Sequence, residues 1–129
     1  MNNPVRILVV EDTLIAQVVL KTQLTQLGCE VDLASDGIIA LDKAQKNPYD
    51  LILMDIGLGE GPDGFDVTLS IKNKSKINKD TPIMAVTAHG EPEYEEKAHA
   101  CGMLGYFKKP FTAADAKIIL ERLENNKRK

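Results

Sequence analysis

The sequence has 129 residues and 43% hydrophobic content, which suffices for one compact domain with a buried core and leaves no room for a second, output-type domain. A formal charge of −3, from 19 acidic against 16 basic residues, argues against nucleic-acid binding, because phosphate binding needs a clustered basic excess. No apolar run approaches the roughly 20 residues that span a membrane, and no leader sequence opens the chain. We therefore expect one cytoplasmic domain over residues 1–129, without a membrane span.

The chain begins with a predicted strand and helix. Residues 6–10 are apolar and predict a buried strand that ends at the acid pair Glu11-Asp12. A helix is expected from Thr13, with Asp12 or Thr13 as its N-cap and Gly28 just past its end. Apolar residues at helical spacing predict its inner face, which comprises Ala16, Val19, Leu20, Leu24 and Leu27.

The next segments contain the residue around which the chain is organised. Residues 29–34 alternate polar with apolar side chains, which predicts a strand near a sheet edge. A helix over about 37–45 ends before Pro48. Residues 51–55 are continuously apolar up to a final carboxylate, Asp55, and a glycine-rich segment follows. This pattern predicts a strand that is covered on both faces and delivers an acid to a loop.

The second half of the chain repeats the alternation. A helix is expected over 65–74, a polar linker over 76–80, and an apolar strand that ends at Thr87. A helix over 92–101 and a short strand over 106–108 follow, and then the corner Lys109-Pro110. Thr112 is expected to cap a last helix, whose inner face comprises Ala116, Ile119, Leu120 and Leu123.

Five strands that alternate with five helices predict an α/β fold, a flavodoxin-like doubly wound parallel sheet of order 2-1-3-4-5. In this order the first and third strands are neighbours, so Glu11, Asp12 and Asp55 converge at one edge. Three adjacent carboxylates repel one another unless a hard divalent cation neutralises them, and Mg²⁺ suits such a site. Thr87 and Lys109 end the next two strands, and the combined inventory fits phosphoryl transfer to an aspartate.

From Ile7 to Leu123 the sequence resembles the receiver domains of bacterial two-component response regulators, of the chemotaxis-regulator type. The motifs, in order, are Leu-Val-Val-Glu-Asp, Leu-Met-Asp, Val-Thr-Ala and Lys-Lys-Pro-Phe. The resemblance implies that the chain is one receiver domain, which takes a phosphoryl group from a histidine kinase or a phosphotransfer protein. It implies a signalling module with no enzymatic activity beyond its own phosphorylation and dephosphorylation, and with an effector that the sequence does not identify.

The same resemblance assigns a role to individual residues. Asp55 is the expected phosphoacceptor, and Lys109 is expected to pair with the phosphoryl group. Glu11 and Asp12 are expected to hold Mg²⁺ together with Asp55 and the backbone carbonyl of Gly57. The expected switch residues are the hydroxyl of Thr87 and the aromatic ring of Tyr106.

The segment 57–64 departs from the family pattern, because it is two residues longer than usual and lacks an early proline. It also contains Gly59-x-Gly61-x-x-Gly64, formally a dinucleotide-binding fingerprint. We discount the fingerprint because Glu60 and Asp63 would repel a pyrophosphate and the motif follows the third strand rather than the first.

Two other functions compete with the receiver interpretation. A magnesium-dependent phosphohydrolase of the haloacid dehalogenase type would need a second aspartate two residues after Asp55, where this chain has Gly57, so the general acid is missing. A purely structural module gives no reason for acids, a hydroxyl and an ammonium to meet at one edge. His89 and His99 lie near a charged helix and are expected to be solvated rather than to carry a phosphoryl group.

Overall fold

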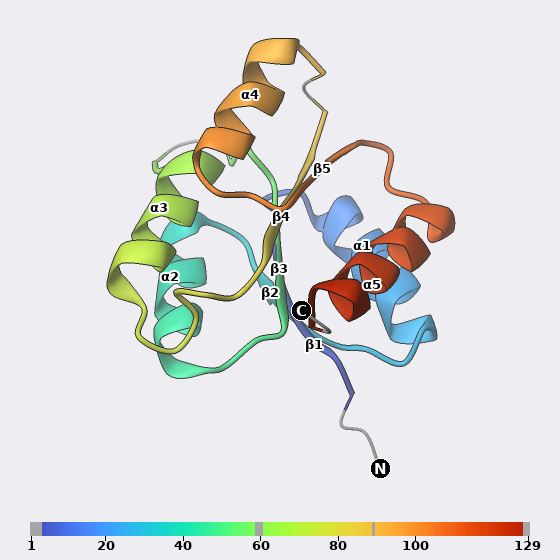
Figure 1. Ribbon diagram of the computed structural model, residues 1–129. Coiled ribbons are helices and arrows are strands. Elements are labelled where there is room, and N and C mark those ends of the chain that lie inside the picture. The colour runs from blue at the N-terminus through green and yellow to red at the C-terminus, as the bar shows by residue number, and fades with distance from the viewer. Residues whose placement is uncertain (1–3, 59–60, 89, 128–129) are drawn as a thin grey trace.

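The computed structural model describes residues 4–58, 61–88 and 90–127, which form one parallel sheet between two layers of helices (Figure 1). The five strands lie in the order β2-β1-β3-β4-β5, so the predicted flavodoxin-like fold with five helices is confirmed. The strands are β1 (Arg6–Val10), β2 (Glu30–Ala34), β3 (Leu51–Met54), β4 (Ile83–Thr87) and β5 (Gly105–Lys108). The helices are α1 (Leu14–Gln26), α2 (Gly37–Lys46), α3 (Gly64–Lys74), α4 (Pro92–Ala100) and α5 (Ala113–Lys127).

Helices cover both faces of the sheet and bury two separate cores. Helices α1 and α5 lie on one face, and α2, α3 and α4 lie on the other (Figure 1). Every residue of β3 and β4 is buried, as expected for central strands whose hydrophobic runs are continuous. β2 is partly exposed, which confirms its predicted place at an edge. The carboxyl ends of β3 and β4 are therefore held in place by strands that are packed on both faces.

The predicted inner face of α1 is only partly correct. Leu20 and Leu24 are buried, but Val19 and Leu27 are each 39% exposed. Leu27 is the C-cap residue, so it lies beyond the last full turn that packs on the sheet. Val19 instead lines a groove between α1 and the segment after β5. Thr13 occupies the N-cap position as predicted, but its side chain donates or accepts no capping hydrogen bond there.

The predicted polar linker 76–80 contains a buried structural residue. Asn78 is fully buried, and its side-chain amide donates to the carbonyl oxygens of Ala44 and Asn47 at 2.6 and 2.7 Å. Its side-chain oxygen accepts from the Tyr49 N–H at 2.9 Å. Asn78 therefore links the loop before β4 to the end of α2 and the loop before β3, at the amino ends of the two central strands.

Among the described residues, no helix is long and apolar enough to cross a bilayer. The cytoplasmic location expected from the sequence stays a prediction.

Candidate functional site

The carboxyl ends of β1 and β3 bring the predicted acids together. Val10 and Met54 are partners in the parallel pairing of these strands, so Glu11 and Asp55 each follow directly after a paired residue. The Asp55 N–H donates to the Val10 carbonyl oxygen at 2.9 Å, which fixes where Asp55 leaves the sheet. Carboxylate oxygens of Glu11, Asp12 and Asp55 lie within 4.8 Å of one another. The convergence expected from the strand order is present.

Lys109 supplies the positive charge that the sequence predicted at this edge. Its ammonium donates to Glu11 Oε1 at 2.5 Å and to Asp55 Oδ2 at 3.2 Å. Its backbone N–H donates to the Thr87 carbonyl oxygen at 2.7 Å, so β4 holds the lysine in place. Burial lowers the pKa of Lys109, but the hydrogen bond to Glu11 and the charges of Asp55 and Glu11 outweigh it and raise the pKa above 10.5. Lys109 is therefore a permanent cation at neutral pH.

The charge balance and the ligand set of this cluster suit a hard divalent cation. Three carboxylates face one ammonium, which leaves a formal excess of two negative charges within the described cluster. Both oxygens of Glu11 already accept hydrogen bonds, from Lys109 and from the Thr13 N–H at 3.0 Å. Asp12 is exposed, and the hydrogen bond recorded for its carboxylate, from the Thr13 hydroxyl, is long at 3.4 Å. Asp12 therefore has the most open oxygens for a metal.

Gly57 lies beside the phosphoacceptor candidate through its backbone. Its N–H donates to Asp55 Oδ1 at 3.1 Å, so the Asp55 carboxylate is held by Gly57 on one oxygen and by Lys109 on the other. This contact orients the carboxylate. The metal-ligand role of the Gly57 carbonyl stays a prediction.

Thr87 and Tyr106 lie on neighbouring strands and face the same side of the sheet. Ala85 pairs with Tyr106 and Thr87 pairs with Lys108 in the β4–β5 register, so the Thr87 and Tyr106 side chains share one face, because side chains alternate along a strand. Thr87 is fully buried. Thr87 and Tyr106, the two residues that the sequence predicts as the switch, therefore lie on the sheet face that α4 covers.

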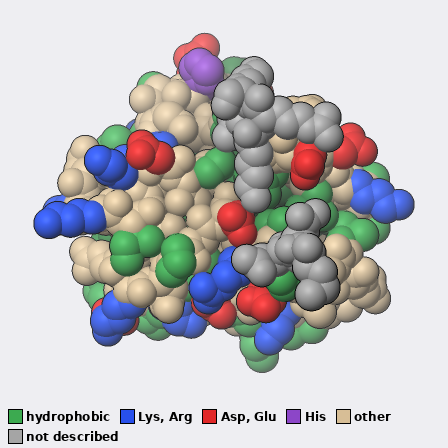
Figure 2. Space-filling view, turned by 60° about the horizontal axis from the view of Figure 1, so that its bottom comes forward, with side chains coloured by type: hydrophobic (Ala, Val, Ile, Leu, Met, Phe, Trp, Pro, Cys, Tyr) green, Lys and Arg blue, Asp and Glu red, His purple; other side chains and the backbone are tan. Residues whose placement is uncertain are grey.

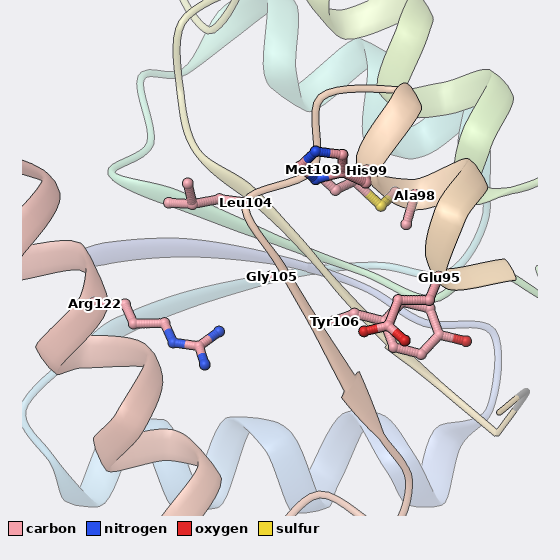
Figure 3. Close-up of a pocket in the computed structure, with 8 residues that line it drawn as sticks. All are labelled: Glu95, Ala98, His99, Met103, Leu104, Gly105, Tyr106 and Arg122. Carbon is pink, nitrogen blue, oxygen red and sulfur yellow. The ribbon is translucent and has the colours of Figure 1, made fainter. Parts of the chain in front are cut away.

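Tyr106 borders a pocket of about 250 Å³ between α4, β5 and α5 (Figure 3). Burial raises the pKa of the Tyr106 phenol, and the nearby Glu91 and Glu95 carboxylates add to that increase. Glu95 lines the pocket from α4 and Arg122 lines it from α5. The side chains of Ala98 and Met103 form an apolar part of its wall (Figure 3). The Tyr106 ring therefore sits at the junction of three elements.

Sequence reasoning missed Gln17, which contacts the acid pair from α1. Its side-chain amide donates to the Glu11 backbone carbonyl at 2.7 Å. Gln17 stands one helical turn after Thr13 and points back toward the helix start, and this spacing was the signal that could have identified it.

Some predicted residues fall outside the site or outside the described chain. His99 is exposed and lines the pocket beside Tyr106, remote from the acids. His89, Gly59 and Glu60 lie outside the described residues. Asp63, of the discounted dinucleotide fingerprint, caps α3 by accepting from the Asp66 N–H at 2.9 Å.

The prediction that the chain does not bind nucleic acid stays a prediction. Figure 2 shows basic and acidic side chains interspersed over the face it presents.

Comparison with known proteins gives a consistent result. A family model described as the response regulator receiver domain matches residues 7–121. The chain is 35% identical over 117 residues to the sensor protein EvgS of Escherichia coli K12, which covers 91% of this chain but only 9% of EvgS. It is also 31% identical over 124 residues to the chemotaxis protein CheY-3 of Vibrio cholerae, covering 95% of this chain and 94% of that protein.

A solved structure adds a description of the equivalent site. The receiver domain of the sensor histidine kinase PA1611 from Pseudomonas aeruginosa superposes with a TM-score of 0.83 at 36% identity. The alignment covers 94% of this chain and 98% of that domain, which is described with a magnesium ion coordinated in its active-site cleft. These matches favour the receiver interpretation over the phosphohydrolase alternative.

Proposed function

The chain belongs to the response regulator receiver domain family, and from this premise we propose that Asp55 is its phosphoacceptor. Receiver domains are phosphoacceptor modules of two-component signalling rather than classical enzymes. The observation that supports the assignment is the position of the Asp55 carboxylate, 3.2 Å from the Lys109 ammonium and within 4.8 Å of the Glu11 and Asp12 oxygens. We propose that residues 1–129 act as a single receiver domain.

In the proposed reaction an Asp55 oxygen attacks the phosphorus of a phosphohistidine. The P–O bond to Asp55 forms as the P–N bond breaks, and the electron pair stays on the imidazole nitrogen of the donor, which then takes a proton from solvent. Gly57 orients the carboxylate through its N–H, and Lys109 pairs with a phosphoryl oxygen. Mg²⁺, when bound by Glu11, Asp12, Asp55 and the Gly57 carbonyl, supplies charge that stabilises the phosphoryl oxygens. The same residues would allow self-phosphorylation from small donors and slow hydrolysis.

A switch at β4 and β5 follows from the same chemistry. The Thr87 hydroxyl is one strand away from Asp55 and can donate to a phosphoryl oxygen. Because Tyr106 shares the sheet face of Thr87, movement of Thr87 toward Asp55 opens space into which the Tyr106 ring turns. The face of α4, β5 and α5 is where we expect an effector to detect the change.

The α1 surface suits docking of the phosphoryl donor. Receiver domains of this kind interact with histidine kinases or phosphotransfer proteins. A groove of about 570 Å³ lies between α1 and the residues after β5, and Ile15, Val19 and Phe111 line it. Ile15 is 76% exposed, and Leu14, Val18 and Val19 beside it on α1 are exposed as well, so the helix presents a cluster of large apolar side chains. Lys109 borders both this groove and the acid cluster, so a donor helix that inserts apolar side chains here brings its phosphohistidine to Asp55.

The proposal is tested with acetyl phosphate and Mg²⁺. Intact mass spectrometry should detect one added phosphoryl group, stable in acid and labile in base, and peptide mapping should locate it on Asp55. Asp55→Asn should abolish the gain, whereas Asp42→Asn, which changes an exposed surface acid, should leave it intact. A phosphoryl group on His89 or His99 would overturn the assignment.

A further inference from the structure

We propose that Gln17 is a positioning residue for magnesium binding, through a hydrogen bond that sets the direction of Asp12. The proposal rests on the metal site of the proposed function. Gln17 carries no charge and contacts none of the site carboxylates in the described structure; its side-chain amide donates to the Glu11 carbonyl oxygen at 2.7 Å. Any effect of Gln17 on the metal must therefore act through the backbone.

Glu11 and Asp12 are held in different ways. The Glu11 N–H donates to the Ala34 carbonyl oxygen at 3.0 Å, and its two carboxylate oxygens accept from Lys109 and from the Thr13 N–H. Glu11 is only 1% exposed. Asp12 is exposed, and its carboxylate has the long contact with the Thr13 hydroxyl. The side chain of Glu11 is thus fixed by its own contacts, and that of Asp12 depends on the backbone that carries it.

The Glu11 carbonyl belongs to the peptide group that joins Glu11 to Asp12. Because a peptide group is planar, fixing the direction of its carbonyl oxygen also fixes the N–H of Asp12, and thereby restricts ψ of Glu11 and φ of Asp12. Gln17 fixes that oxygen from the end of the first turn of α1, a helix anchored on the sheet by the buried Leu20 and Leu24. The geometry points to a rigid link from α1 to the carboxylate with the most open oxygens.

Removal of a contact that orients a metal ligand typically weakens metal binding by ten- to a hundredfold. Since Asp12 is one of several expected ligands, we expect the low end of that range for Gln17. Gln17→Met keeps the length and the helix preference of the side chain and removes the amide group that donates to Glu11. Gln17→Asn keeps the amide but is too short to reach the carbonyl, so both variants should behave alike.

Gln23 provides a matched control on the same helix. Its side-chain amide also donates to a backbone carbonyl oxygen, that of Phe111, at 3.2 Å, and it lies six residues further along α1 than Gln17. Gln23→Met therefore removes the same kind of contact without affecting Asp12. Thermal unfolding of all three variants shows whether each is folded.

In the experiment, Mg²⁺ is titrated into the full chain, and binding is measured by calorimetry and by the NMR signal of the Asp12 amide. The rate of phosphorylation by acetyl phosphate is then measured as a function of Mg²⁺ concentration. Gln17→Met and Gln17→Asn should bind Mg²⁺ roughly tenfold more weakly, with near wild-type phosphorylation rates at saturating Mg²⁺, while Gln23→Met binds as the wild type does. Equal affinities in the wild type and Gln17→Met, or equal losses in Gln17→Met and Gln23→Met, would overturn the role of Gln17 alone. No Mg²⁺ binding by the wild type would overturn the metal site itself and the role of Gln17 with it.

Discussion

Gly64, the first residue of α3, lies directly against the backbone of Asp55. A Cβ at this position would overlap the Asp55 carbonyl oxygen and lie 2.8 Å from the Ile56 Cα atom. The Gly64 N–H donates to the Ile56 carbonyl oxygen at 3.0 Å, which holds the start of α3 on the end of β3. The start of α3 therefore packs against the backbone of Asp55, the proposed phosphoacceptor, and of Ile56.

Gly64→Ala should destabilise the fold by about 2 kcal/mol and slow phosphorylation of Asp55, because only backbone atoms can move to make room for the methyl group. Gly37→Ala is a matched control at the first residue of α2, where the nearest obstacle is a side-chain atom, Val67 Cγ2. It should cost less stability and leave the phosphorylation rate unchanged. Urea unfolding and acetyl phosphate labelling measure both effects, and equal rates in the two variants would contradict this role of Gly64.

Lys109→Met should destabilise the chain in the absence of Mg²⁺. The substitution leaves the buried Glu11 carboxylate without its ammonium partner, and we expect a loss of about 2 kcal/mol, because the Thr13 N–H still compensates part of the charge. Lys108→Met, which changes an exposed neighbour, should stay within about 0.5 kcal/mol of the wild type. Equal unfolding midpoints for the two variants would refute the structural role of the Lys109–Glu11 pair.

The same lysine predicts a loss of stability at alkaline pH. The folded pKa of Lys109 is raised, so its contribution is complete below the unfolded value of 10.5 and is lost as pH rises through the folded pKa. The free energy of unfolding should therefore fall above about pH 10.5, and the fall should be shallower in Lys109→Met. The check is a series of urea titrations from pH 8 to about pH 12. An identical slope in both proteins would show that Lys109 does not contribute.

The sequence predicted the strand order and the convergence of acids because both depend on patterns that a linear chain carries. Continuous apolar runs identify β3 and β4, and the register of parallel strands then places Glu11 beside Asp55. Contacts made through backbone atoms were not predictable in this way. Gln17 binds a carbonyl oxygen and Asn78 binds three main-chain groups, and a polar residue in a helix or linker gives no sign of such partners. Exposure of Val19 likewise depends on a groove formed by distant residues.

Asn78→Ala should cost roughly 3 kcal/mol, because it leaves the Asn47 carbonyl oxygen and the Tyr49 N–H without their side-chain partner in a buried site. The Ala44 carbonyl oxygen loses the Asn78 amide but still accepts from the Ser75 hydroxyl at 2.9 Å. Asn73→Ala, on the exposed face of α3, should change stability by no more than about 0.5 kcal/mol. Guanidinium unfolding of both variants provides the test. If Asn78→Ala unfolds at the wild-type midpoint, the residue does not join the two loops.

Phosphorylation should alter α4 as well as the loop that carries Asp55. One route is the Thr87–Tyr106 pair, and a second is the ring of Phe65, which follows Gly64 and stacks on Tyr94 of α4 with centroids 6.4 Å apart. A beryllium fluoride mimic should shift amide signals near Ala88, near Tyr106 and along α4. Shifts confined to residues 55–58 would contradict both routes, and Tyr94→Leu should reduce the α4 shifts if the second one contributes.

The glycine at position 57 predicts a short lifetime for phospho-Asp55. Its N–H lies 3.1 Å from Asp55 Oδ1, so any side chain at 57 would begin next to the phosphoryl group. Hydrolysis needs a water molecule in line with the bond to the Asp55 oxygen, and a bulky side chain could shield that approach or displace the water. Glycine does neither, and its backbone is harder to order over the site.

Gly57→Met should therefore lengthen the lifetime by about fivefold, which corresponds to a barrier increase of roughly 1 kcal/mol. Magnesium affinity should change little, because a ligand at this position would be the backbone carbonyl, which methionine retains. Decay of the phosphorylated protein is followed in the wild type, Gly57→Met and His89→Ala. Equal lifetimes in the wild type and Gly57→Met would rule out an open site at Gly57. A changed lifetime in His89→Ala alone would show that His89, rather than Gly57, governs the access of water.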